Sequence, residues 1–334
     1  MNKNNAKTVI KVLLTFVLLY LLSQKVKIED IYLLLKNISL RYVVILLTIN
    51  VIMVAISCFK WRIFLRATGT EIPVRTLMAY YYIGYFFNNL LPSSIGGDVA
   101  RMYLLGKNID DNTKSISTVF LERYTGVIAL IALAIVAAVL NKRVAFQPAI
   151  MFPLSIMALV LIGSLIFFSF DGIKTWTYDL FDYNFLTSIK NKFDGFYQSV
   201  SYFRKQVKII IYSMFHSFSF HIMTIINTLV SCWALDISPG IFDLAVTVPI
   251  ILFVSMVPIT IGSIGLWEGT FVFFFSQIGI LPEDAVAVAL VLRSVAILMG
   301  LLGGVFYLFR RRMLKHPPSP ITESCAKNIP SRTD

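Results

Sequence analysis

Long apolar segments recur along the whole chain and constrain its fold more than any other feature. They cover residues 9–23, 42–59, 76–92, 115–140, 148–170, 209–235, 244–279 and 285–309. A helix needs about 20 apolar residues to cross a bilayer, and several segments reach that length. Hydrophobic residues make up 57% of the chain and charged residues 14%, against roughly 25% in a soluble domain. Because strand-like alternation is absent, the sequence predicts an all-α, polytopic membrane protein.

Two of the apolar segments are interrupted by proline and glycine. Residues 92–98 read PSSIGGD and residues 258–263 read PITIGS, so the two interruptions share the pattern Pro-x-Ser/Thr-Ile-Gly-Gly/Ser. Corresponding interruptions in two halves of a chain are typical of transporters, whose binding sites lie where the helices break. An ordinary kink is the alternative for either interruption alone, because membrane helices tolerate proline and glycine.

The distribution of positive charge favours a particular topology. The net charge is +12, and the lysines and arginines cluster between apolar segments, which is a pattern of membrane topology rather than of nucleic-acid binding. If both interrupted segments are re-entrant hairpins, the strongest basic clusters all lie in the cytosol together with both termini. We therefore predict about six full transmembrane helices plus two re-entrant hairpins in the cell membrane. The units 42–140 and 209–309 then form an inverted repeat.

The remaining segments complete the predicted organisation. Residues 1–312 are expected to form one integral membrane domain. Within it, residues 171–208 carry apolar residues at helical spacing among lysines and arginines, which predicts an amphipathic helix on the inner leaflet or a helix packed on the membrane domain. The polar, proline-rich tail 313–334 is predicted to be disordered in the cytosol.

Ionisable residues lie inside or beside the apolar segments, where each would cost about 2.5–3.5 kcal/mol at the centre of a lone helix. The first half carries Asp98, Arg101, Glu122 and Arg123, and the second carries Glu268 and Arg293. The separation from Asp98 to Arg123 equals that from Glu268 to Arg293. Repetition in both halves favours a functional site, and neutralised structural pairs are the alternative.

An anionic head group would suit such a site. Arginines hold phosphate in a bidentate fork, and the carboxylates could orient them or couple transport to protons. Glycines after each break allow close backbone approach, and a half-helix beginning there would aim N–H groups at the cavity. The predicted substrate-binding residues are Pro92, Gly96, Gly97, Asp98, Arg101, Glu122, Arg123, Pro258, Gly262, Gly265, Glu268 and Arg293.

Other reactive residues do not form a recognisable site. Three scattered cysteines and two histidines, His216 and His221, lack metal-ligand spacing, so no metal, cofactor or catalytic residue is predicted. Trp61 among Lys60, Arg62 and Arg66 predicts an interface anchor, with phosphate capture as the alternative. The aromatic residues 80–87 are expected to pack against lipid and neighbouring helices.

Several motifs together resemble the lysylphosphatidylglycerol synthase transmembrane family, also called the flippase-like domain family. They lie at residues 59–69, 89–101, 122–126, 258–268 and at Arg293, so that the resemblance covers nearly the whole chain. The resemblance implies lipid translocation by a membrane domain that stands alone or accompanies an aminoacyl transferase or glycosyltransferase domain. Since only about 25 residues follow the last apolar segment, we expect no aminoacyl transferase domain here, and a lysyltransferase label would be inherited from fused members.

Three hypotheses for function follow. The first is a flippase for an anionic phospholipid, aminoacyl-phospholipid or polyprenyl-phosphate lipid, which is not an enzyme. The second is a membrane-embedded transferase or subunit in lysylphosphatidylglycerol or lipid-linked glycan synthesis, with Asp98, Glu122 or Glu268 as general base. The third is a scaffold for a separate lipid-modifying enzyme. Homo-oligomers are compatible with all three.

Overall fold

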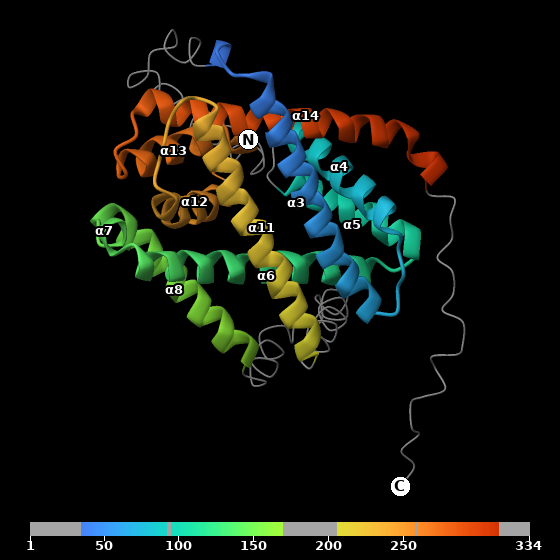
Figure 1. The fold of residues 1–334 in the computed structure, drawn as a ribbon. Coiled ribbons are helices and arrows are strands. Elements are labelled where there is room, and N and C mark those ends of the chain that lie inside the picture. Colours follow the sequence, from blue (N-terminus) through green and yellow to red (C-terminus); the bar gives the residue numbers. More distant parts are fainter. Residues whose placement is uncertain (1–34, 92–94, 170–205, 258, 314–334) are drawn as a thin grey trace, which may run out of the picture.

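The computed structural model describes residues 35–91, 95–169, 206–257 and 259–313, and its regular structure over those ranges is entirely helical (Figure 1). The predicted span 9–23, nearly all of the predicted amphipathic segment 171–208 and the tail after residue 313 lie outside the described residues. Pro92 and Pro258, both predicted site residues, lie outside them as well.

The described helices form two halves, and corresponding helices follow one another in the same order in each half. The first half holds α3 (Leu40–Ala67), α4 (Val74–Leu90), α5 (Gly96–Ile109) and α6 (Asn112–Leu140), followed by α7 (Lys142–Ala145) and α8 (Pro148–Ser169). The second half holds α11 (Val207–Trp233), α12 (Ile241–Ser255), the short 3₁₀ turn η2 (Ile261–Ser263), α13 (Leu266–Ser276) and α14 (Pro282–Met313).

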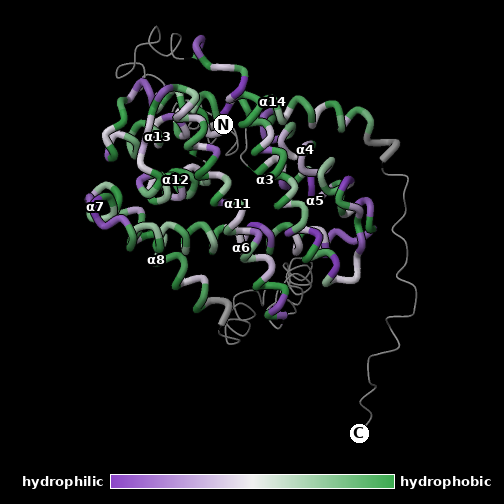
Figure 2. Tube along the Cα trace, in the orientation of Figure 1, coloured by the Kyte–Doolittle hydropathy of each residue, from purple (hydrophilic) through white to green (hydrophobic). Residues whose placement is uncertain are grey.

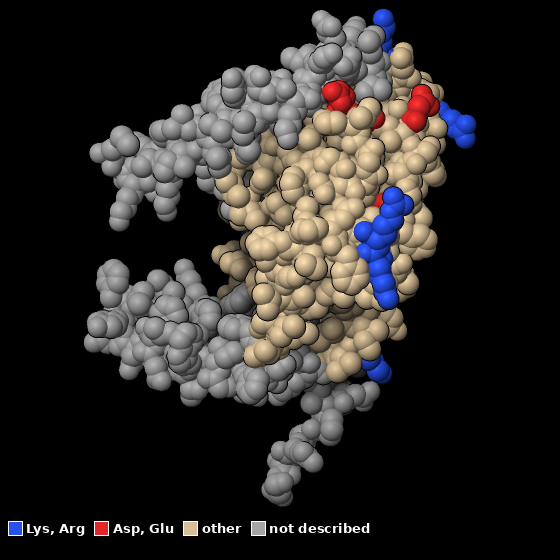
Figure 3. All heavy atoms as spheres, turned by 90° about the vertical axis from the view of Figure 1, so that its left-hand side faces the viewer, with Lys and Arg blue, Asp and Glu red and all other residues tan. Residues whose placement is uncertain are grey.

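Five of the described helices are long and apolar enough to cross a membrane, namely α3, α6, α8, α11 and α14. They coincide with five of the predicted spans, and the prediction of a polytopic all-α membrane protein is confirmed. Hydrophobic residues predominate along α8 and α14 (Figure 2). Among the described residues of the face shown in Figure 3, most are uncharged, as expected of a surface in contact with lipid.

Both interrupted segments consist of two short helices in contact with each other. α4 and α5 have 17 and 14 residues, and α12 and α13 have 15 and 11, so each is shorter than the roughly 20 residues that span a bilayer. α4 ends at Leu90 before the first predicted break, and α12 ends at Ser255 before the second. The breaks therefore lie where proline and glycine interrupt the sequence.

The contacts between helices are preserved when the two halves are exchanged. α5 packs on α6 as α13 packs on α14, while α3 and α11 lie side by side between the halves (Figure 1). In addition, α4 packs on α14 of the other half, and α12 packs correspondingly on α6. Each half thus places its first short helix against the last long helix of the other half, so that the halves interlock.

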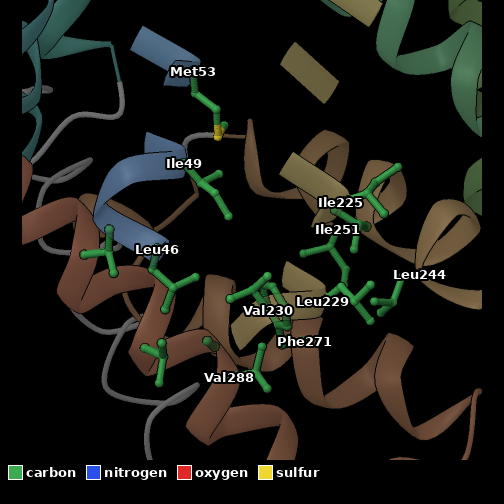
Figure 4. Close-up of a cluster of buried hydrophobic side chains, with 14 of the residues drawn as sticks. Leu46, Ile49, Met53, Ile225, Leu229, Val230, Leu244, Ile251, Phe271 and Val288 are labelled. Carbon is green, nitrogen blue, oxygen red and sulfur yellow. The ribbon is translucent and has the colours of Figure 1, made fainter. Parts of the chain in front are cut away.

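An apolar core fills the space between the interlocked helices (Figure 4). Each of its labelled side chains is less than a tenth exposed. They come from α3, α11, α12, α13 and α14 and are Leu46, Ile49, Met53, Ile225, Leu229, Val230, Leu244, Ile251, Phe271 and Val288. The core therefore holds α3 of the first half against α11, α12, α13 and α14 of the second.

The contact between α4 and α14 depends on glycine. A Cβ atom on Gly303 would overlap the backbone carbonyl of Tyr82, and one on Gly300 would overlap the side chain of Asn89. Small residues let membrane helices approach to backbone contact, where van der Waals packing drives association. Asn89 also donates a hydrogen bond across this contact, from Nδ2 to the carbonyl oxygen of Ala296 at 3.1 Å.

We expect Gly303→Ala to destabilise the protein by about 1–3 kcal/mol, because the added methyl group forces α4 and α14 apart. Gly163→Ala in α8 is the matched control, since nothing lies within 4 Å of a Cβ atom there. That change should be neutral or stabilising by at most about 1 kcal/mol. Thermal unfolding in detergent measures both, and equal midpoints for the two variants would contradict the close α4–α14 packing.

Candidate functional site

Four predicted charged residues form one ion-pair network between α5 and α6, which we call the first-half cluster: Asp98, Arg101, Glu122 and Arg123. Asp98 Oδ1 accepts hydrogen bonds from Arg101 Nη2 at 2.6 Å and from Arg123 Nη2 at 2.7 Å. Arg101 Nη1 donates to Glu122 Oε2 at 3.1 Å. Carboxylates and guanidinium groups thus neutralise one another where isolated charges would be costly.

Arg101 is enclosed by aromatic side chains from α3 and α4. Its guanidinium carbon lies 4.1 Å from the ring centroid of Tyr81 and 5.1 Å from that of Trp61, close enough for cation–π attraction. Tyr81 donates its hydroxyl to Glu122 Oε1 at 2.5 Å. The Arg101 side chain is only 2% exposed, so it holds Asp98 and Glu122 in place from the interior of the protein.

These aromatic contacts correct one expectation from the sequence and extend another. Trp61 is fully buried and donates from Nε1 to Thr118 Oγ1 at 3.3 Å, so it is not an interface anchor. Tyr81 packs against neighbouring helices as expected and is in addition a polar partner of the first-half cluster. Aromatic residues are abundant in this chain, and the sequence carries no feature that separates these two from the rest.

Glu268 and Arg293 form the second-half cluster between α13 and α14. Arg293 Nε donates to Glu268 Oε1 at 2.7 Å, and Nη1 and Nη2 donate to the carbonyl oxygens of Gly262 and Ser263 at 3.4 and 3.3 Å. Glu268 Oε2 accepts from the N–H of Gly265 at 2.8 Å and so caps α13. Arg293 therefore ties α14 to the backbone of the second break.

One ion pair is equivalent in the two halves. Arg123 and Asp98 are 25 residues apart, as are Arg293 and Glu268, and both pairs have an N···O distance of 2.7 Å. Both arginines are also accessible, with side chains 55% and 26% exposed. The predicted similarity of the halves ends there, because Phe271 and Leu292 occupy the second-half positions that match Arg101 and Glu122.

The glycines after the breaks have structural roles that the sequence alone does not distinguish from ligand binding. Gly97 packs so closely that a Cβ atom would overlap the carbonyl oxygen of Gly84, and its N–H donates to Asn88 Oδ1 at 2.7 Å. The predicted backbone donors at Gly97 and Gly265 are therefore already bonded within the protein. Gly96 is buried against the side chain of Leu91, again as a packing residue.

The second break has left-handed backbone at three residues. Gly262, Ser263 and Gly265 have φ angles of 57°, 56° and 78°. Glycine adopts this conformation freely, whereas a residue with a Cβ atom is strained by roughly 1–2 kcal/mol. The serine in place of a second glycine therefore stores strain beside Arg293.

His216 and His221 make no hydrogen bond to either cluster in the described structure. His216 Nδ1 and His221 Nε2 each lie within hydrogen-bonding distance of a backbone carbonyl oxygen, of Tyr212 at 2.8 Å and of Gly126 at 2.9 Å. Over the part of the chain that the structure describes, no three His, Cys, Asp or Glu side chains are grouped as metal ligands would be.

The fold and the two clusters define a multi-pass α-helical membrane protein with charged pairs held beside broken helices. A family model described as "Lysylphosphatidylglycerol synthase TM region" matches residues 8–304. The chain belongs to this family, as its motifs predict.

Two relatives come from methanogenic archaea. A protein of Methanothermobacter thermautotrophicus described as "UPF0104 membrane protein" is 22% identical over 277 residues, covering 77% of this chain and 82% of the relative. A UPF0104 membrane protein of Methanocaldococcus jannaschii is 23% identical over 322 residues, covering 92% and 96%. No solved structure matches the chain.

We expect Glu268→Ala to lower stability by about 3 kcal/mol, because it removes a buried carboxylate and leaves Arg293, which is one-quarter exposed, without its partner. The N–H of Gly265 loses its partner as well. Glu71→Ala removes a pair of similar geometry, with Arg66 at 3.3 Å, whose side chains are about half exposed. It should change stability by less than about 1 kcal/mol. Thermal unfolding of both variants in detergent compares them, and similar losses would contradict a structural role for the Glu268–Arg293 pair.

We expect Ser263→Gly to raise stability by about 1 kcal/mol, because glycine adopts the left-handed conformation of this residue without strain. Ser263→Ala keeps the Cβ atom and should give no gain. The unfolding midpoints of the two variants against the unchanged protein test this. A loss of stability on introducing glycine would show that the serine side chain contributes more than the backbone strain removes.

Proposed function

We propose that this protein transports a lipid with an anionic head group between the leaflets of the cell membrane, as a flippase. The candidate cargo is a phospholipid, an aminoacyl-phospholipid or a polyprenyl-phosphate lipid. The observation that carries the proposal is the pair of equivalent, accessible arginines, Arg123 and Arg293, each held by one carboxylate beside a broken helix. A guanidinium group that is accessible and pre-oriented is suited to bind phosphate.

The proposal includes a topology. The pairs α4–α5 and α12–α13 act as re-entrant hairpins, and the units 42–140 and 209–309 form an inverted repeat with both termini in the cytosol. The shortness of the four helices supports the hairpins, since none reaches the length of a span. The contacts that persist when the halves are exchanged support the repeat.

In the proposed mechanism the head group passes from one arginine to the other. Lipid phosphate competes with Asp98 for Arg123 and with Glu268 for Arg293, so each carboxylate neutralises its arginine when no cargo is bound. Rocking of one repeat against the other then exposes the two arginines to opposite leaflets in turn. Arg101, enclosed by Tyr81 and Trp61, keeps Asp98 and Glu122 in place during the cycle.

We further propose that the protein is not an enzyme. A general base needs a free carboxylate within reach of the substrate. Asp98, Glu122 and Glu268 are each bonded to an arginine, and Glu122 and Glu268 are also nearly fully buried. This arrangement suits counter-ions better than bases.

We expect Arg123→Gln and Arg293→Gln each to slow lipid transport by about 10- to 100-fold, since each removes a charge-assisted hydrogen bond to phosphate. The assay follows a fluorescent phosphatidylglycerol in proteoliposomes, with dithionite quenching the label in the outer leaflet. Arg66→Gln, in an exposed pair with Glu71, is the matched control and should transport normally.

Transport at the unchanged rate in both variants would overturn the site. Mass spectrometry of the same vesicles separates the transporter from a transferase, because transport leaves the lipid chemically unaltered. A new covalent lipid product formed by the purified protein with a candidate donor would contradict the proposal that it is not an enzyme.

A further inference from the structure

A buried lysine on α3 has no counter-ion among the described residues. Lys60 is 7% exposed, and its only hydrogen bond there runs from Nζ to Ser217 Oγ on α11, at 2.9 Å. An ammonium group carries three N–H donors, so two remain without a partner in the described structure. A buried ammonium group is costly unless it is paired with an anion or fully hydrogen-bonded.

The charges around Lys60 do not balance without such an anion. Lys60 directly precedes Trp61, whose ring lies against Arg101 of the first-half cluster. The two carboxylates of that cluster are already bonded to Arg101 and Arg123. The first-half cluster together with Lys60 therefore holds three cations and two anions, whereas Glu268 and Arg293 balance each other in the second-half cluster.

A second unsatisfied polar group lies beside the first. His221, one turn from Ser217 on α11, is 6% exposed, and its Nε2 lies 2.9 Å from the carbonyl oxygen of Gly126. Since a carbonyl oxygen only accepts, Nε2 carries the hydrogen in this bond. Nδ1 is buried without a partner among the described residues, and in this tautomer it can only accept a hydrogen bond.

The nearby hydroxyl groups are already engaged. Ser217 donates its hydroxyl hydrogen to the carbonyl oxygen of Ser213 at 2.9 Å, so its oxygen accepts the hydrogen bond from Lys60 Nζ. Ser213 and Thr125 are bonded to each other at 3.0 Å. The unsatisfied donors of this region are therefore those of the Lys60 ammonium group.

Beside the ammonium group of Lys60, there is space at Gly126. A Cβ atom on Gly126 would have the Lys60 Nζ atom 3.4 Å away and no other described atom within 4 Å. Gly126 itself is partly exposed on α6. The missing side chain thus leaves the charged end of Lys60 approachable from the Gly126 side.

We propose that Lys60, on the central helix α3, binds a phosphate group beside Gly126. Lysine binds phosphate as a point charge, and its two free N–H donors match phosphate oxygens. A lipid head group and free phosphate share this chemistry. The site is separate from the arginines of the proposed function and is tested by binding alone, so its failure would leave the transport proposal standing.

The test uses the delipidated full-length protein in maltoside detergent and follows its unfolding midpoint. The probes are dioleoyl phosphatidylglycerol, against dioleoylglycerol as the lipid without phosphate, and inorganic phosphate, against chloride at equal ionic strength. We expect phosphatidylglycerol to raise the midpoint and Lys60→Met to weaken its apparent affinity by about tenfold or more. Lys60→Arg keeps the charge and should retain the shift.

The control is Lys208→Met, which removes an exposed lysine from α11 and should bind as the unchanged protein does. Without a probe, Lys60→Met should unfold no earlier than the unchanged protein, because it removes an unpaired buried charge. A merely structural lysine would give the opposite result. A shift with inorganic phosphate that also depends on Lys60 would assign the site to free phosphate, and a shift with the lipid alone would assign it to the head group.

A second variant covers the case in which Lys60→Met does not fold. Gly126→Ala favours the helix and leaves Lys60 in place, yet its methyl group fills the space beside Nζ and should reduce the phosphate-dependent shift. Equal shifts in Lys60→Met and in the unchanged protein would overturn the proposal. So would the absence of any shift with either probe in the unchanged protein.

Discussion

The pairing of arginine with carboxylate inside an apolar helical bundle is the constraint on which the rest of the structure depends. Charges in lipid surroundings must be paired, and here each equivalent pair joins a short helix to the long helix that follows it, α5 to α6 and α13 to α14. The pairs thereby fix where the short helices begin and which side chains remain accessible. Arg293 extends this role, because it also donates to the backbone of the second break.

Much of this arrangement could be predicted from the sequence. The spans follow from segment length, and the breaks follow from proline and glycine in otherwise apolar segments. The equal spacing of Asp98–Arg123 and Glu268–Arg293 predicted that the two halves carry matching charges, and both pairs are in contact. These features could be predicted because each depends only on the order of residues along the chain.

Other parts of the site depend on proximity between distant segments, which one sequence does not contain. Tyr81 and Trp61 enclose Arg101 from two different helices, and nothing in the local sequence distinguishes them from the many aromatic residues that only pack. The Gly97 N–H donates a hydrogen bond to Asn88 Oδ1 across the first break. A backbone donor that was expected to bind a ligand is therefore bonded within the protein. The asymmetry of the clusters, by contrast, can be read from the sequence, because Phe271 occupies the second-half position that matches Arg101.

The interlocking of the halves has a consequence for how such a chain could have arisen. Because α4 is covered by α14 and α12 by α6, a single half would expose the apolar faces of one short and one long helix. A second copy of the same half, related by a two-fold rotation, would cover both faces through corresponding contacts, as in a homodimer. Joining two such copies end to end would give the order of helices seen here, with Arg101 in the first half where the second has Phe271.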